Sequence, residues 1–175
     1  MRKKKPIILM IAITVFGLAG ATPAHAATAE SHCVVEVAPV SDRQAPEAPV
    51  CFETPDEVDA YLESIGVSDS SQAARGVAAS TVVGTVYKDA SRGGASLTFW
   101  GSSGCSGVTF GFPSLASGWD NSISSAEGKN GCWVTLYTAT NYGGARLNCT
   151  PYCASVGSWN DNVKSLVFRP TGTFG

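Results

Sequence analysis

The residues best suited to chemistry lie in two short runs, each of which directly follows a tryptophan. The first run is Asp120–Ser125 (DNSISS) and the second is Asn160–Ser165 (NDNVKS). Their carboxylate, amide and hydroxyl oxygens suit a hard divalent cation, which takes about six to eight oxygen ligands. The same residue types form ordinary turns, so inert loops stay open as the alternative. The candidate metal ligands are Asp120, Asn121, Ser124, Asn160 and Asp161, with backbone carbonyls near Ser122 and Asn162 as additional oxygens.

Both runs belong to an internal repeat. Residues 85–97 match residues 135–147 at a constant offset of 50, and residues 119–125 match residues 159–165 at an offset of 40. The first copy therefore carries ten additional residues, around 101–107. A copy of about 40 residues is too short to bury a core alone, so we expect the two copies to share one core. We expect one domain over residues 80–170, with repeat 1 at about 82–127 and repeat 2 at about 132–169.

Short runs of β-branched and aromatic residues alternate with Gly, Asn and Ser along both copies. No helical period of useful length is present, and this pattern predicts an antiparallel sandwich or barrel. The expected strands are Val82–Tyr87, Ala95–Trp100, Val108–Phe112, Cys132–Thr138, Ala145–Thr150 and Val163–Arg169.

The repeat resembles the βγ-crystallin Greek-key family in a first signature. That signature is an aromatic residue, four or five residues, a second aromatic, any residue and then a glycine. Tyr137, Tyr142 and Gly144 match it in full, whereas Arg92 replaces the second aromatic in the first copy.

A second signature is the calcium motif Asn/Asp-Asn/Asp-x-x-Ser/Thr-Ser of the same family. Residues 120–125 match it at every specified position, and residues 160–165 match except at the fifth, where Lys164 stands. The resemblance covers residues 80–170. It implies a mainly β protein that forms a two-motif Greek-key βγ-crystallin-like sandwich. A small N-terminal region with a hairpin and a helix comes before this sandwich.

The resemblance also implies a function. In the family, each of two calcium ions is clamped by both loops, with the fifth-position hydroxyl reaching across. Ser124 then serves one site, while the ammonium of Lys164 disables the other because it has no lone pair. We therefore expect calcium as the cofactor, with one usable site and one weakened site. With only two carboxylates in the motifs, the expected affinity is weak and its effect is structural stabilisation.

Residues 1–26 are typical of a secretory signal peptide, with a basic start, an apolar run over 7–21 and a small-x-small cleavage site at 24–26. The apolar run falls below the roughly 20 residues that a transmembrane helix needs. We therefore expect a secreted, extracellular protein that begins at Ala27 and does not associate with membranes after cleavage.

The charge of the mature chain is acidic and unevenly distributed. Without residues 1–26 it holds 8 basic and 14 acidic residues, a net charge of −6, of which residues 27–75 carry −8 and residues 76–175 carry +2. Such a chain lacks the clustered basic surface that phosphates require, which argues against a nucleic-acid partner. We expect a monomer.

All the cysteines follow the predicted signal peptide, and an even count in an exported chain indicates disulfides. Connectivity stays open, although Cys33 with Cys51 is the first choice because the other four lie far downstream. No CxxC pair is present, which argues against structural zinc. The six cysteines are Cys33, Cys51, Cys105, Cys132, Cys149 and Cys153.

Residues 27–75 form the acidic N-terminal region, which a small polar linker-like stretch closes near residue 76. A possible hairpin spans Cys33–Cys51, and one helix is expected near 55–65. Thr54 is a plausible N-cap and Glu57 completes a capping box. The region is either a pro-region or partner-binding element, or a small subdomain that packs on the main domain, which we favour.

No catalytic residues are expected, so we predict that the protein is not an enzyme. His32 is the sole histidine after residue 26, is expected to be solvent exposed, and has no GxSxG motif to accompany it.

The second functional alternative is an inhibitor of an extracellular peptidase. Residues 132–137 and 141–144 also resemble the repeat of secreted bacterial metalloproteinase inhibitors of related Greek-key fold. The candidate inhibitory loops are residues 101–107 and the ring 149–153, if its two cysteines pair. A third alternative is a killer-toxin-like or cell-wall module whose tryptophans contact sugars; Trp119 and Trp159 are expected in the core. The four tryptophans are Trp100, Trp119, Trp133 and Trp159.

Overall fold

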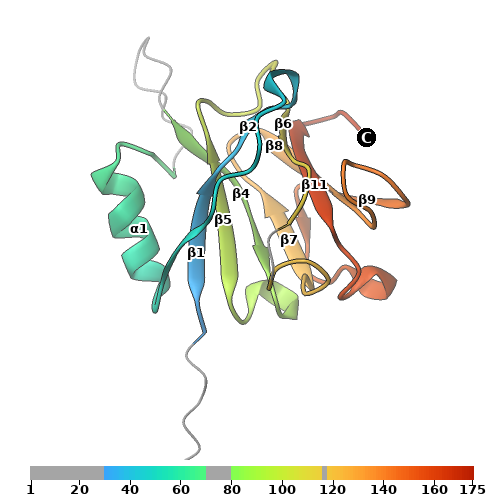
Figure 1. The fold of residues 1–175 in the computed structure, drawn as a ribbon, viewed down its shortest axis with the longest axis horizontal. Coiled ribbons are helices and arrows are strands. Elements are labelled where there is room, and N and C mark those ends of the chain that lie inside the picture. Colours follow the sequence, from blue (N-terminus) through green and yellow to red (C-terminus); the bar gives the residue numbers. More distant parts are fainter. Residues whose placement is uncertain (1–29, 70–79, 116–117) are drawn as a thin grey trace, which may run out of the picture.

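Two β-sheets pack face to face in the part of the chain that the computed structural model describes, residues 30–69, 80–115 and 118–175 (Figure 1). The predicted signal peptide, residues 1–26, lies outside these residues. No helix among them is long and apolar enough to cross a membrane. One sheet has six strands in the order β10-β7-β4-β5-β1-β3, and the other has five in the order β2-β6-β11-β8-β9.

The two copies of the repeat each supply four strands, and each copy sends its third strand into the other copy's sheet. β6 pairs with β11, and β10 pairs with β7. Both sheets consequently contain the same order of third, fourth, first and second strand, related by a pseudo-twofold axis. Copy 1 comprises β4 (Thr81–Tyr87), β5 (Ser96–Gly101), β6 (Phe110–Phe112) and β7 (Ser125–Gly128). Copy 2 comprises β8 (Cys132–Tyr137), β9 (Arg146–Cys149), β10 (Tyr152–Cys153) and β11 (Ser165–Pro170).

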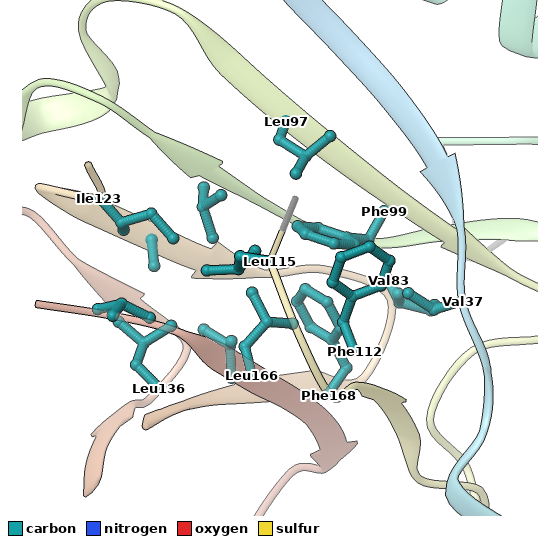
Figure 2. Close-up of a cluster of buried hydrophobic side chains, with 14 of the residues drawn as sticks. Val37, Val83, Leu97, Phe99, Phe112, Leu115, Ile123, Leu136, Leu166 and Phe168 are labelled. Atoms are coloured by element: carbon teal, nitrogen blue, oxygen red, sulfur yellow. The ribbon is translucent and has the colours of Figure 1, made fainter. Parts of the chain in front are cut away.

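The main core lies between the sheets, where the inward positions of both copies are apolar (Figure 2). Phe99 of β5 is its centre. The ring of Phe99 lies 5.3 Å from that of Phe112 and 5.2 Å from that of Phe168, so it contacts the second sheet through both strands β6 and β11. All three phenylalanines are almost fully buried. Because β6 belongs to copy 1 and β11 to copy 2, neither copy completes this core alone.

The N-terminal region adds a strand to the edge of each sheet. β1 (His32–Glu36) pairs with β5 in parallel. β3 (Val50–Phe52) pairs antiparallel with the free edge of β1. Between them the chain crosses to the five-stranded sheet, where β2 (Ala38–Pro39) pairs with β6. The short 3-10 turn Val40–Asp42 follows. Residues of this region also enter the main core, so the region is part of the sandwich and does more than pack against it.

The predicted helix is α1 (Pro55–Ser64), and it begins as expected. The Thr54 hydroxyl accepts the Glu57 N–H at 3.3 Å, and the Glu57 carboxylate accepts the Thr54 N–H at 3.1 Å, which forms the capping box. α1 covers the outer face of the six-stranded sheet through a second small core. That core contains Val34, Val58, Leu62, Val67 and Val82, with Phe52, Tyr61 and Trp100 around it.

All six strands expected from the sequence are present, with ends that differ by one or two residues. β7 was not expected because Ser125–Gly128 is too short and too polar to give an alternating pattern. Its strand is stabilised by pairing with β4 and β10. The short strands β2 and β10 were missed for the same reason.

Candidate functional site

Each copy begins with a folded hairpin whose tip has left-handed backbone. In copy 1 the 3-10 turn Ala90–Arg92 lies between β4 and β5, with φ of 57° at Ser91 and 64° at Arg92. In copy 2, Asn141 and Tyr142 have φ of 54° and 60°. These conformations are strained for L-residues, and polar side chains such as Asn tolerate them best. They bend each hairpin back onto its own sheet.

The last serine of each oxygen-rich run holds its folded hairpin in place. Ser125 Oγ donates to the Asp89 carbonyl at 2.6 Å and accepts the Arg92 N–H at 3.1 Å. Ser165 Oγ makes the same two bonds, with the Ala139 carbonyl at 2.6 Å and the Tyr142 N–H at 3.0 Å. This structural role was not predicted from the sequence. The feature that could have indicated it is that each serine follows its tryptophan at the same spacing.

The two oxygen-rich loops cross each other through a reciprocal pair of backbone hydrogen bonds. The Asn121 N–H donates to the Val163 carbonyl at 2.9 Å, and the Asp161 N–H donates to the Ile123 carbonyl at 3.4 Å. Asn121 and Asp161 occupy equivalent positions and have nearly equal φ, 53° and 55°. Each loop therefore lies against the residue that precedes the fifth motif position of the other loop.

This crossing sorts the candidate ligands into two groups. Asp161 is bonded to the residue before Ser124, which carries a hydroxyl. Asn121 is bonded to the residue before Lys164, which carries an ammonium group. Among the described residues, no three His, Cys, Asp or Glu side chains come together at one point.

The oxygens at the first group have specific neighbours. Ser124 is 8% exposed, and its hydroxyl donates to the Lys88 carbonyl at 2.6 Å, which leaves the lone pairs of Ser124 Oγ for another partner. The Asp161 carboxylate is exposed and accepts from Asn160 Nδ2 at 2.8 Å. Each of these side-chain bonds is therefore made within one copy of the repeat.

The other candidate residues have different surroundings. Ser122 Oγ donates to the Gly118 carbonyl at 3.1 Å, so its hydroxyl is turned toward its own loop. Asp120 and Asn162 are exposed. Trp119 is 5% exposed and the Lys88 ammonium lies 5.1 Å above its ring, whereas Trp159 is partly buried against the core. Both tryptophans thus pack inward, as their repeat position predicted.

A charged cluster takes the place of the missing aromatic in copy 1. The Arg92 guanidinium lies 2.6 Å from the Glu127 carboxylate and 3.8 Å from the ring of Tyr152. The same carboxylate accepts the hydroxyl of Tyr87 at 2.8 Å. Burial, followed by the bond to Glu127, raises the pKa of the Tyr87 phenol.

His32 contradicts the expectation that it is solvent exposed. It is 9% exposed, and its Nδ1 lies 2.9 Å from Ser96 Oγ. The expectation was wrong because β1 pairs with β5 in parallel, which sets His32 directly opposite Ser96 on the outer face of the sheet.

All three disulfides form among the described residues. Cys33–Cys51 joins paired positions of β1 and β3, which confirms the first-choice pairing. Cys105–Cys132 ties the additional loop of copy 1 to the start of β8. Cys149–Cys153 closes the small ring between β9 and β10, in which Thr150 and Pro151 are exposed.

Comparison with solved structures finds βγ-crystallin domains. A domain from Flavobacterium johnsoniae is 26% identical and an archaeal βγ-crystallin is 27% identical, each with a TM-score of 0.37. They cover 53% and 51% of this chain, and 99% and 96% of their own. The N-terminal domain of protein S is 18% identical with a TM-score of 0.37, over 50% of this chain and 96% of its own. No protein-family profile and no curated protein matches the sequence.

The fold is βγ-crystallin-like. Two folded hairpins, exchanged third strands and crossed loops recur in both copies at the sequence positions of the two signatures. The sandwich of the two copies comprises β4 to β11, and β1, β2, β3 and α1 are additions to it.

Proposed function

We propose that this protein is secreted and that its βγ-crystallin-like domain binds one calcium ion, which stabilises the fold. The observation that carries the proposal is the reciprocal pair of hydrogen bonds between the two loops. It joins Asp161 to Ile123, the residue before Ser124, so the backbones of the two motifs are in contact. Three disulfides suit an oxidising extracellular environment.

The donor set fits a calcium ion. Asp161 would supply the carboxylate, Ser124 the hydroxyl and Asn160 an amide oxygen, with the Lys88 carbonyl 2.6 Å from Ser124 Oγ as a further oxygen. Calcium accepts such neutral oxygens and tolerates irregular geometry. The opposite group has Asn121 and Asp120 but meets Lys164, whose positive charge opposes a cation. The arrangement therefore favours one usable site of low affinity.

A thermal melt of residues 27–175 in EDTA and in calcium tests this proposal. A ligand that binds only the folded state raises its stability by mass action. With a Kd of about 1 mM, about 10 mM calcium contributes about 1.4 kcal/mol, which raises the midpoint by roughly 3–6 °C for a domain of this size.

Matched variants locate the site. Ser124→Lys copies the residue that the second motif already carries, so it removes the ligand in a form that this fold accommodates. Asp161→Asn removes the carboxylate of the usable site, and Asp120→Asn makes the same change at the weakened one. The calcium-dependent rise in the melting midpoint should vanish in Ser124→Lys and shrink in Asp161→Asn. It should persist in Asp120→Asn. A shift that is equal in all three, or is absent in the parent protein, contradicts the proposal.

Peptidase inhibition is the second candidate, and the Cys149–Cys153 ring favours it. The ring spans five residues, presents exposed Thr150 and Pro151, and is held at both ends by paired strands. A loop constrained in this way loses little entropy on binding. Micromolar mature protein should slow one member of a panel of extracellular peptidases, metallopeptidases included, and Pro151→Ala with Thr150→Ala should relieve the inhibition. A panel without inhibition removes this candidate.

A wall-associated module is the third candidate. Trp133 and Trp100 are partly exposed whereas Trp119 is buried, so the first two are the tryptophans available to a sugar.

A further inference from the structure

The outer face of the five-stranded sheet carries a line of aromatic side chains with an arginine among them. On β8, Val134 and Leu136 point into the main core, so Trp133, Thr135 and Tyr137 point outward. The ring of Tyr142 lies 6.0 Å from that of Tyr137. Tyr137 itself is only 7% exposed. We call this surface the aromatic face, and its accessible residues are Trp133, Tyr142, Arg146, Arg169 and Phe174.

The tail that follows β11 completes this face. The Thr171 N–H donates to the Gly131 carbonyl at 3.0 Å, which ties the start of the tail to the residue before β8. The ring of Phe174 then lies 5.3 Å from that of Trp133. Phe174 is nevertheless 66% exposed, the largest value among the exposed large apolar residues described. An aromatic held on the surface by another aromatic offers a flat apolar contact to a partner.

The arginines of this face have no carboxylate partner. Arg169 Nη2 donates to the Tyr137 hydroxyl at 3.1 Å, while its buried Nε has no hydrogen-bond partner among the described residues. Arg146 lies opposite Tyr137 on β9 and is exposed. The ion pairs of the described residues are Arg92–Glu127 and Lys129–Asp69, so neither arginine takes part in one. None of the strands that form this sheet carries an Asp or Glu. The face is therefore positive and aromatic on a chain that is acidic elsewhere.

We propose that the aromatic face binds an acidic polysaccharide, with sugar rings stacked on Trp133 and Phe174 and sugar carboxylates paired with Arg146 and Arg169. The C–H faces of sugar rings stack on flat aromatic side chains without needing a cavity. An arginine fork matches a carboxylate with two parallel hydrogen bonds. The rings of this face are tilted toward one another, by 48° for Trp133 with Phe174 and by 62° for Tyr137 with Tyr142. The high charge density of a nucleic acid is disfavoured by the acidic N-terminal region.

Titration calorimetry with a hyaluronan decasaccharide tests the proposal, with cellohexaose as the neutral polymer and a polyglutamate peptide as the acidic non-sugar. All titrations contain EDTA, so the result is independent of the calcium proposal. Hyaluronan should bind, while the neutral sugar and the peptide bind at least about tenfold more weakly. Phe174→Ala and Arg146→Gln should each weaken hyaluronan binding by roughly threefold to tenfold, the range expected for one aromatic or charge-assisted contact.

Two control variants separate the face from general effects of charge and apolar surface. Lys129→Gln removes one positive charge away from the face, and Ile65→Ala removes an exposed apolar side chain at the end of α1. Neither should change hyaluronan binding. Because Phe174 and Arg146 are exposed, their variants should melt like the parent protein. No binding at about 1 mM hyaluronan, equal binding by all variants, or tighter binding of polyglutamate or cellohexaose would overturn the proposal.

Discussion

Arg92 occupies in copy 1 the backbone position that Tyr142 occupies in copy 2. Both residues are left-handed, with φ of 64° and 60°, and the N–H of each donates to the last serine of its motif. Their side chains hold the hairpin differently. The Tyr142 ring packs on Tyr137, whereas Arg92 pairs with Glu127 and stacks on Tyr152. The folded hairpin is therefore preserved by its backbone, and either an aromatic or an ionic contact can cover it.

Replacing Arg92 with alanine should destabilise the domain by about 1–2 kcal/mol, because Glu127 is 9% exposed and loses its charged partner. This loss of stability is at the lower end of the range for a buried ion pair, because the arginine side chain is 48% exposed. Urea unfolding measures it. Lys129→Ala breaks the more exposed pair with Asp69 and should cost less than about 1 kcal/mol. Equal losses in the two variants would show that the Arg92 cluster contributes no more than a surface ion pair.

The stability of the protein should fall at alkaline pH because of two tyrosines. Burial first, and then the bond to Glu127, raises the pKa of Tyr87, and burial followed by the charge of Tyr137 raises that of Tyr142. A group whose folded pKa is raised contributes stability below its unfolded pKa, about 10 for tyrosine. That contribution is lost as the pH rises from there toward the folded pKa.

Urea unfolding between about pH 8 and pH 11 measures this loss, with the tyrosinate absorbance of the native protein as a second readout. Tyr87→Phe cannot ionise and should flatten the decline. If the pH dependence is the same in the parent and in Tyr87→Phe, ionisation of Tyr87 is not coupled to unfolding.

Val35 should contribute to the stability of the whole sandwich, although it lies outside both copies of the repeat. It is 3% exposed and belongs to the main core through the pairing of β1 with β5. Val35→Ala removes two methyl groups and should cost about 2 kcal/mol in urea unfolding, from lost burial and the cavity that remains. Val40→Ala is the control, since Val40 is 39% exposed and its truncation should cost less than about 0.5 kcal/mol. If both variants unfold like the parent, β1 is not part of the cooperative core.

The sequence predicted the features that depend on residues close together in the chain. These are the strands of the repeat, the capping box at Thr54 and the Cys33–Cys51 pairing. The parallel pairing of β1 with β5 was not predictable, because Val34 and Val35 indicate a strand but not its partner, which lies 64 residues further along the chain. The burial of His32 follows from that pairing and was missed with it. For the same reason, the motifs named Ser124 and Lys164, but the reciprocal hydrogen bonds between the two loops were not predictable.

Lys164→Ser should convert the weakened group into a second calcium site. The two groups are related by the same backbone geometry, with Lys164 N–H bonded to the Tyr137 carbonyl at 2.8 Å as Ser124 N–H is to the Tyr87 carbonyl at 2.9 Å. A serine at 164 would replace an ammonium by a hydroxyl next to Val163, whose carbonyl accepts the Asn121 N–H. Titration calorimetry should then show two calcium equivalents where the parent shows one, and the calcium-dependent rise in midpoint should increase. The combined variant Lys164→Ser with Asp120→Asn should weaken the new site and leave the original unaffected, because the original depends on Asp161. A stoichiometry that Lys164→Ser leaves unchanged would mean that the charge of Lys164 is not what separates the two groups.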